Sequence, residues 1–402
     1  MLRILRVVPF YAPAYGYGGP VVHSVNLSKQ QAALGYDVRV FTTNILTHDL
    51  ISKELPKFEV RDGVKIHRFP IKYRLGQSHY FITPTLPFAF FKYQFDLIHV
   101  HSLRTFQNNA ATIISRIRNK PFVFTAHGTL RSMYLLDLFN LKKKESSRMK
   151  IYDRFFKKSL LKTADRFIVH SKHEKMWTLK FNVPEDKIRV IPHGINLENF
   201  SNITFRENFI RRYKINLNDK MVLYIGRLLR NYRNLEHLIM IMNEILKEIK
   251  NVKLWLIGHS YDKTYELELK NMVKKLNLDK HVIFVSHPSR EDILGAYQVA
   301  NVVVFPINNS DGFGIPLIEA GAAKCPVIST NRGPAPELVK NGETGILTQS
   351  NNLSELKNAT LKILCNEKLE KEMGLKGYQN VVKYYTWKTI TNITNKVYDE
   401  LF

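Results

Sequence analysis

The stretch FPINNSDGFGIPLIEAGAAKCPVIST, from Phe305 to Thr330, predicts half of a βαβ unit. An apolar strand over Asn301–Pro306 leads into a polar, glycine-containing loop, a helix starts near Pro316, and a second apolar strand follows. In an open parallel sheet, ligands bind in loops at the carboxyl ends of strands. We therefore expect an anionic group at this helix N-terminus, received by backbone amides of Phe313, Gly314, Ile315 and Leu317.

Two carboxylates bracket the same loop. Asp311 precedes the helix and Glu319 follows in its first turn, with seven residues between them. Both could face one ligand from opposite ends of the amide cluster. The alternative interpretation makes Asp311 a solvated turn residue and Glu319 an acid that the helix dipole favours near the N-terminus.

Length and composition predict a globular protein of two domains. A chain of 402 residues exceeds what one core usually serves, and 45% apolar residues can form sizeable cores. The two cysteines, Cys325 and Cys365, imply no disulfide framework and favour a reducing compartment. The N-terminal MLRILRVVPF is too short for the apolar core of a signal peptide, and apolar runs elsewhere are broken. We therefore expect no transmembrane helix and a cytoplasmic protein.

The net charge of +25 is unevenly distributed along the chain. Residues 1–195 hold 32 Lys and Arg against 13 Asp and Glu, whereas the remainder holds 28 against 22. Within Arg131–Lys180, cations alternate with apolar residues as in a basic amphipathic helix. Three interpretations remain open: peripheral contact with the anionic cytoplasmic face of a membrane, binding of nucleic-acid phosphates, or a solvated basic face.

The N-terminal segment also predicts a βαβ unit. A strand over Leu2–Val8, a helix over Pro20–Leu34 and a strand over Tyr36–Thr42 follow one another, with a glycine-containing loop at the first turn. The loop lacks the G-x-G-x-x-G pattern, so a nicotinamide site is weakly supported. The pair Gly18 and Gly19 before the helix would let backbone approach a phosphate, although a plain tight turn explains it almost as well.

Three histidines lie at predicted strand ends. His99 and His101 alternate along one strand and share a face, but no third ligand stands nearby in the sequence, so we interpret them as structural. His127 follows the strand Phe122–Ala126. A lone histidine at such a position is either structural or catalytic.

A second series of alternating strands and helices starts at Met221 and predicts another doubly wound sheet. The preceding segment Phe200–Asp219 is polar without strong periodicity, and we expect a hinge there. The first strand of the second series ends at Arg227, with Arg233 six residues beyond. Two arginines at the carboxyl edge of a sheet suit a diphosphate, while the alternative is two ordinary surface arginines.

The spacing of an acid, seven residues and Glu around Gly-Phe-Gly-Ile-Pro-Leu resembles the E-x7-E signature of the GT-B retaining glycosyltransferases related to family 4, the glycosyl transferases group 1. The resemblance implies an α/β class with two Rossmann-like doubly wound domains facing a cleft. Its domains would be an acceptor-binding domain (residues 1–198), a nucleotide-sugar domain (199–385) and a helix crossing back to the first domain (386–402). The positions that match the family's motifs, which we call stations, occur in the family's order. They are Gly18-Gly19, His127, Ser171, Gly194, Gly226-Arg227, Asp311, Gly314 and Glu319.

The resemblance assigns a role to each station. It implies that Asp311 meets donor-sugar hydroxyls, that Glu319 holds the ribose hydroxyls, and that the imidazole of His127 lies near the donor sugar. These three form the expected catalytic set. The expected donor-binding set is Gly18, Gly19, Arg227, Arg233, Phe313, Gly314, Ile315 and Leu317.

Four positions depart from the family's usual residues. Asp311 replaces Glu and its side chain is shorter by about 1.5 Å. Arg233 stands where Lys is usual, with Arg230 as an alternative. His193 and Asn196 replace the commoner Asn and Asp, which we interpret as tolerable changes at an interdomain edge.

The implied reaction moves a sugar from a nucleoside-diphosphate donor to an acceptor hydroxyl with retention of configuration, and it requires no metal or other cofactor. The basic N-terminal half favours a lipid-linked or cell-surface glycan as acceptor, at an anionic membrane surface. The alternatives are a sugar-nucleotide epimerase of the same fold and a basic nucleic-acid-binding protein. The sequence shows no base-stacking or groove-reading motif, so we expect no nucleic-acid partner.

Overall fold

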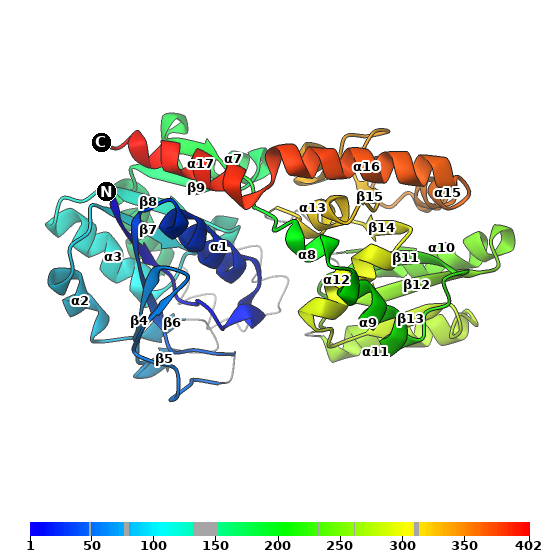
Figure 1. Ribbon diagram of the computed structural model, residues 1–402, viewed down its shortest axis with the longest axis horizontal. Helices are drawn as coiled ribbons and strands as arrows, with labels where there is room; N and C mark the ends of the chain where they lie inside the picture. The colour runs from blue at the N-terminus through cyan, green and yellow to red at the C-terminus, as the bar shows by residue number, and fades with distance from the viewer. Residues whose placement is uncertain (48–49, 76–79, 132–151, 231–232, 261, 309–312) are drawn as a thin grey trace. The chain divides into compact units, whose positions relative to one another are not determined.

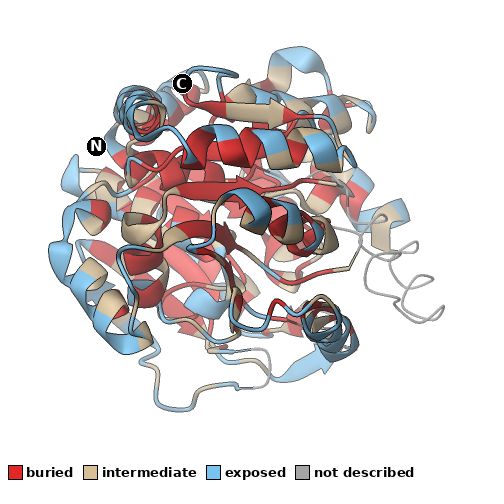
Figure 2. Ribbon diagram, turned by 90° about the vertical axis from the view of Figure 1, so that its right-hand side faces the viewer, coloured by how far each residue is buried: buried red, intermediate tan, exposed pale blue. Residues whose placement is uncertain are grey.

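The computed structural model describes residues 1–47, 50–75, 80–131, 152–230, 233–260, 262–308 and 313–402 (Figure 1). Contacts divide the chain into two compact units. The N-terminal unit comprises Met1–Gly194 together with Trp387–Phe402, and the C-terminal unit comprises Ile195–Thr386. Each unit is an α/β layer structure around its own sheet. Buried strands lie inside and the outer faces of helices are exposed, whereas the edge strand of the N-terminal sheet is exposed (Figure 2).

The N-terminal unit contains, within its described residues, an eight-stranded sheet of order β10-β9-β8-β7-β1-β2-β4-β3, parallel except for the edge strand β3. A separate hairpin pairs β5 with β6. The strands are β1 (Arg3–Val7), β2 (Asp37–Thr43), β3 (Phe58–Arg61), β4 (Val64–Phe69), β5 (Tyr73–Leu75), β6 (Tyr80–Ile82), β7 (Leu97–His101), β8 (Phe122–Thr125), β9 (Arg166–Val169) and β10 (Ile188–Val190). The helices are α1 (Gly19–Ala33), α2 (Leu86–Lys92), α3 (Phe106–Ile117), α6 (Lys158–Thr163), α7 (Lys172–Leu179) and α17 (Trp387–Asp399).

Successive side chains along these strands point alternately into two cores, one on each face of the sheet, and each core is covered by its own helices. In β1, Leu5 and Val7 belong to the core beneath α2, α3 and α6, whereas Ile4 belongs to the core beneath α1 and α17. This follows from the two-residue period of a strand, which directs successive side chains to opposite faces. The sheet is covered on both sides, so its strands are near-continuous apolar runs.

The C-terminal helix α17 packs against α1 in the N-terminal unit, although almost two hundred residues of the other unit separate it from that unit in sequence (Figure 1). Tyr398 of α17 is fully buried, and its hydroxyl lies 2.6 Å from Nδ1 of His99. Nη2 of Arg6 donates to the same hydroxyl at 3.3 Å. Gln31 of α1 donates to Asn395 at 2.7 Å. The helix is therefore held by apolar packing and by a buried polar network.

The C-terminal unit contains, in its described part, a six-stranded parallel sheet of order β13-β12-β11-β14-β15-β16. Its strands are β11 (Lys220–Ile225), β12 (Val252–Ile257), β13 (Val282–Val285), β14 (Val302–Phe305), β15 (Val327–Thr330) and β16 (Gly345–Thr348). Its helices are α8 (Glu198–Ser201), α9 (Ile203–Tyr213), α10 (Leu235–Glu248), α11 (Lys263–Lys275), α12 (Arg290–Val299), α13 (Ile315–Ala322), α14 (Ala335–Leu338), α15 (Leu353–Leu364) and α16 (Glu367–Tyr384).

The two doubly wound sheets confirm the fold class predicted from the sequence. The prediction of a hinge without regular structure over Phe200–Asp219 is wrong, because this segment contains a helix. Most of Phe200–Asp219 is the helix α9, which Asn202 caps by accepting a hydrogen bond from the amide of Thr204. Phe209 is 1% exposed and belongs to the core of the C-terminal unit. Phe205, Phe209 and Tyr213 recur at every fourth residue and pack on that core, a helical spacing that the prediction overlooked among the polar residues between them.

We expect Tyr398→Phe to lower the free energy of unfolding by about 1–3 kcal/mol, because the buried partners His99 and Arg6 lose a hydrogen-bonding group. The matched control is Tyr384→Phe, since Tyr384 is 44% exposed and should change stability little. Urea unfolding followed by circular dichroism measures both. Equal effects of the two variants would show that the network does not hold α17.

Candidate active site

The C-terminal unit has a topological switch point between the neighbouring strands β11 and β14. From β11 the chain proceeds to β12 and β13 on one side, and from β14 it proceeds to β15 and β16 on the other. The loops after β11 and β14 therefore diverge at the carboxyl edge of the sheet, where doubly wound folds bind ligands. They are the loops that carry Arg227, Arg233 and the Phe313–Leu317 segment.

Glu319 lies in α13, which begins after Gly314 in a left-handed conformation (φ 90°) that glycine adopts without strain. Its carboxylate is 6% exposed and accepts two hydrogen bonds from α12. Nη2 of Arg290 donates to Oε1 at 2.7 Å, and the Tyr297 hydroxyl donates to Oε2 at 3.1 Å. Each carboxylate oxygen can accept a further hydrogen bond, so the group is fixed in orientation and still able to receive ligand hydroxyls.

The Tyr297 phenol acts as a dedicated donor to this carboxylate. Burial and the nearby charge of Glu319 raise the pKa of Tyr297 well above its ordinary value. The phenol therefore stays protonated and keeps its hydrogen bond. Arg290 and Tyr297 were not predicted from the sequence, because α12 precedes the motif by a whole strand and its orientation depends on packing.

The arginines after β11 differ in their surroundings. Arg227 is exposed, and its carbonyl oxygen accepts a hydrogen bond from the Tyr224 hydroxyl at 2.9 Å. Arg233 is 7% exposed, and its guanidinium carbon lies 4.5 Å from the ring centroid of Phe305, the last residue of β14. Arg230 instead pairs with Glu268, at 2.6 Å. Arg233 is thus the arginine beside the switch point, and Arg230 is engaged by an acid on α11.

The loop after β14 is described only in part. Asp311 lies outside the described residues. The amide of Leu317 donates to the carbonyl of Gly314 at 3.0 Å, so this one of the predicted anion-binding amides has an internal partner. The ring of Phe313 is 5% exposed and lies 6.3 Å, centroid to centroid, from that of Tyr385.

The glycine pair of the N-terminal unit lies at the other switch point, between β1 and β7. Gly18 caps α1 with φ 76° and ψ −141°, a backbone conformation that side chains disfavour, while a Cβ built there would meet nothing within 4 Å. The requirement for glycine is therefore conformational. Gly19 begins α1 and is followed by Pro20 in the first turn.

His127 occupies a strained turn after β8. Its φ is +52°, and Gly128 follows with φ +76°. Both ring nitrogens face other histidines: Nε2 lies 2.9 Å from Nδ1 of His101, and Nδ1 lies 3.0 Å from Nε2 of His170. Burial, with the neighbouring His170, holds the pKa of His127 well below its ordinary value, so the imidazole is neutral at pH 7.

Glu174 holds the turn that carries His127. It accepts hydrogen bonds from the amide of Gly128 at 2.5 Å and from the amide of His170 at 2.7 Å. Ser171 caps α7 by accepting from the amide of Glu174. Burial raises the pKa of the Glu174 carboxyl to about 7. Ser171 therefore has a structural role: it caps α7 at Glu174, whose carboxylate holds the backbone just after β8 and β9.

Histidines stand at or just beyond the ends of four adjacent strands, and the sequence analysis treated them one by one. His101 ends β7, His127 follows β8, His170 follows β9, and His193 follows β10. Carboxyl ends of parallel strands meet at one edge of the sheet, so this recurrence was the signal that could have predicted a cluster. Together with His23 of α1, they form a group of rings that we call the histidine cluster. His193 is 6% exposed and lies one residue before Gly194, where this stretch of the N-terminal unit ends, so it is a buried residue at the edge of that unit.

Two doubly wound units of this kind define the GT-B class of architecture. The Anabaena protein HepE, solved in complex with UDP and glucose, superposes with a TM-score of 0.74 at 18% identity and complete coverage of both chains. An uncharacterised glycosyltransferase of Methanocaldococcus jannaschii is 26% identical over 99% of this chain and 98% of its own. A D-inositol 3-phosphate glycosyltransferase of Corynebacterium jeikeium is 26% identical over 76% of this chain and 73% of its own.

Family models match both halves of the chain. Residues 17–199 match Glycosyltransferase Family 4, and residues 205–380 match Glycosyl transferases group 1. The chain belongs to this glycosyltransferase family. In the part of the chain that the structure describes, no helix combines the length and apolar character needed to cross a bilayer.

We expect Arg290→Met to lower the free energy of unfolding by about 1–3 kcal/mol, because it leaves the buried Glu319 carboxylate without its cation. The loss is smaller than for a fully buried pair, since the Arg290 side chain is 52% exposed. The control is Lys247→Met, which breaks an exposed pair of the same 2.7 Å length with Glu244 and should cost below about 0.5 kcal/mol. Chemical denaturation compares the two variants, and indistinguishable losses would contradict an anchoring role for Arg290.

Proposed function

We propose that the protein transfers a sugar from a nucleoside-diphosphate donor, bound at the switch point of the C-terminal unit, to an acceptor hydroxyl with retention of configuration. The observation that carries this proposal is the carboxylate of Glu319, oriented by Arg290 and Tyr297 beside that switch point. A carboxylate with remaining acceptor capacity suits paired hydroxyls such as those of a ribose. The complexes of HepE with UDP and with UDP-glucose support a donor of this type.

The chemistry follows from the leaving group. Cleavage of the anomeric bond leaves negative charge on the departing diphosphate, and fixed cations and amides stabilise such charge. Arg227, Arg233 and the helix start at Ile315 supply these groups. The acceptor attacks the face that the diphosphate leaves, and a phosphate oxygen takes the acceptor proton, which retains the configuration. This step uses no metal ion on the diphosphate.

We further propose that the acceptor bears an anionic or lipid-linked group and meets the N-terminal unit at a membrane surface. The helices α2, α3 and α6 pack in succession, α2 on α3 and α3 on α6. Large apolar side chains stay exposed along them: Phe88 at 76%, Phe91 at 60%, Ile117 at 64% and, just before α6, Phe155 at 62%. Exposed apolar groups of this number are typical of surfaces that bind a partner or a lipid.

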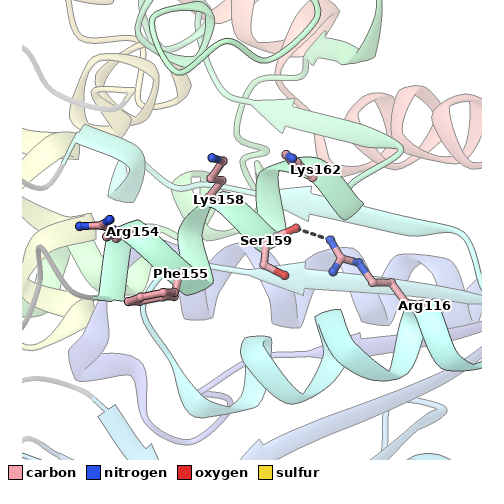
Figure 3. Close-up of a pocket in the computed structure, with 6 residues that line it drawn as sticks. All are labelled: Arg116, Arg154, Phe155, Lys158, Ser159 and Lys162. Atoms are coloured by element: carbon pink, nitrogen blue, oxygen red, sulfur yellow. Dashed lines mark hydrogen bonds between the residues drawn. The ribbon is translucent and has the colours of Figure 1, made fainter.

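Cations lie beside one of these apolar groups, Phe155. Between α3 and α6 lies a hollow of about 420 Å³, lined by Arg116, Arg154, Phe155, Lys158, Ser159 and Lys162 (Figure 3). Arg116 donates to the Ser159 carbonyl at 3.0 Å, which ties the two helices together under the hollow. Cations beside exposed aromatic rings match anionic headgroups and the acyl boundary beneath them. The D-inositol 3-phosphate named for the Corynebacterium relative supports an acceptor with a phosphate.

The donor site is tested by calorimetry with UDP-, GDP-, ADP- and dTDP-sugars. We expect one donor to bind saturably, and Glu319→Ala to weaken its binding at least tenfold, or about 1.4 kcal/mol. Glu244→Ala, on the exposed face of α10, is the control and should bind like the wild type. Binding of no donor, or equal binding by Glu319→Ala, would contradict the site. Turnover of the donor to an isomeric sugar nucleotide without acceptor would indicate an epimerase instead.

The membrane surface is tested by co-sedimentation with vesicles of phosphatidylcholine, with and without phosphatidylglycerol. We expect binding only to the anionic vesicles, and the triple variant Arg154→Glu, Lys158→Glu, Lys162→Glu to abolish it, since each cation near the surface adds about 1 kcal/mol. Phe88→Ser with Phe91→Ser should weaken binding without changing its dependence on salt. The control carries Lys274→Glu and Lys275→Glu on α11. No binding by the wild type, or equal loss in the control, would rule this surface out.

A further inference from the structure

The histidine cluster contains a triad whose ligand atoms converge. His23, His170 and His193 each present one ring nitrogen, and these three nitrogens lie within 4.8 Å of one another. All three side chains are buried. They come from three elements, namely α1, the end of β9 and the segment after β10, so the fold itself brings them together.

The spacing of two of these atoms fits a shared metal ion. Nδ1 of His23 lies 3.3 Å from Nδ1 of His193. Two imidazole nitrogens bound tetrahedrally to one zinc ion at about 2.0–2.1 Å stand roughly 3.3–3.4 Å apart. The rings of His170 and His193 are adjacent, with centroids 3.9 Å apart.

Hydrogen bonds fix which nitrogen His170 presents. Its Nδ1 lies 2.9 Å from the carbonyl oxygen of Ile191, which can only accept, so Nδ1 carries the proton and Nε2 carries the lone pair. A backbone carbonyl behind one ring nitrogen is the arrangement that orients metal-binding histidines. The backbone amide of His170 donates to the Glu174 carboxylate at 2.7 Å, which fixes the main chain that carries this ligand.

The ring protons of His127 and His101 can be assigned in turn from their hydrogen bonds. The assignment leaves one buried ring nitrogen with a lone pair and no partner. Nδ1 of His127 donates to Nε2 of His170, so Nε2 of the neutral His127 accepts from Nδ1 of His101. Nε2 of His101 then bears a lone pair, and it has no hydrogen-bond partner within the described residues although the side chain is 1% exposed. Buried polar atoms are rarely left in this state, so a water or other donor group belongs beside Nε2 of His101, whose ring centroid lies 5.9 Å from that of His23.

We propose that His23, His170 and His193 bind one divalent ion of the late first-row transition metals or zinc. Imidazole nitrogen is a favoured ligand of these metals, whereas magnesium and calcium require oxygen ligands. The site belongs to the N-terminal unit and does not take part in the transfer step on the donor diphosphate. A bound ion occupies the lone pair on Nε2 of His170, which the ring of His127 otherwise uses, and so bears on the orientation of His127.

The experiment uses the full chain without a histidine tag, stripped with chelator and titrated with zinc against a chromophoric competitor. We expect one zinc ion per chain and a raised midpoint of thermal unfolding. His193→Asn introduces the residue commoner in the family at this station and should weaken zinc binding at least tenfold. The control is His259→Asn with His287→Asn, an exposed pair in the C-terminal unit with the same 3.3 Å separation of Nδ1 atoms. Among the described residues, this pair forms no group of three metal-ligating side chains. This double variant should leave the tight site unchanged.

X-ray absorption of the zinc-loaded wild type tests the ligands without any variant. A first shell with three imidazole nitrogens at about 2.0 Å supports the triad. A shell of oxygen or of fewer than three imidazoles overturns it. So does a chain that binds no zinc at micromolar concentration, or that loses zinc in the His259→Asn, His287→Asn control but keeps it in His193→Asn.

Discussion

The meeting of parallel strand ends at one edge of a sheet is the constraint on which the rest of this structure depends. Parallel strands require crossover helices, so both faces of each sheet are covered and only the carboxyl edge is left for loops that carry chemistry. In the C-terminal unit this edge holds Glu319 and the arginines after β11. In the N-terminal unit it holds the glycine pair and the histidine cluster. Both sets come from segments far apart in sequence.

Covering both faces also explains the buried polar groups. The two-residue period of β7 turns His99 and His101 toward α1 and α17, while Ile98 and Val100 face the opposite core. A histidine in such a layer must find partners. His99 finds them in Tyr398 and Thr125, so the last helix of the chain completes the polar layer of the first sheet.

Much of the fold could be predicted from the sequence because each strand and helix carries its own periodic signal. The strands β1, β2, β8 and β14 lie within a residue or two of the predicted ranges. Short edge strands such as β3 (Phe58–Arg61) were not predicted, since a largely exposed strand of four residues lacks a clear pattern. The helix α9 was missed although Phe205, Phe209 and Tyr213 have helical spacing, because polar and charged residues stand between them.

The site was predictable only where its residues follow one another in the chain. The loop, the helix start and Glu319 form one continuous motif, whereas Arg290 and Tyr297 reach that carboxylate from another helix, and only packing decides which face of α12 they occupy. The same limit applies to the histidines. Each is ordinary by itself, and His23 on α1 has no sequence relation to His193. Their association depends on strand order, which a local pattern does not contain.

His193 shows why a departure from a family pattern needs its surroundings before it can be interpreted. As an isolated exchange of Asn for His at the end of a segment, it reads as neutral. In the structure its ring packs against those of His23 and His170, in a layer that water does not reach. A neutral imidazole has one N–H donor and one acceptor nitrogen. Adding such a ring to a buried hydrogen-bonded group therefore changes what the neighbouring rings must donate or accept. The exchange therefore belongs with the other histidines as one physical unit, and that unit includes His127.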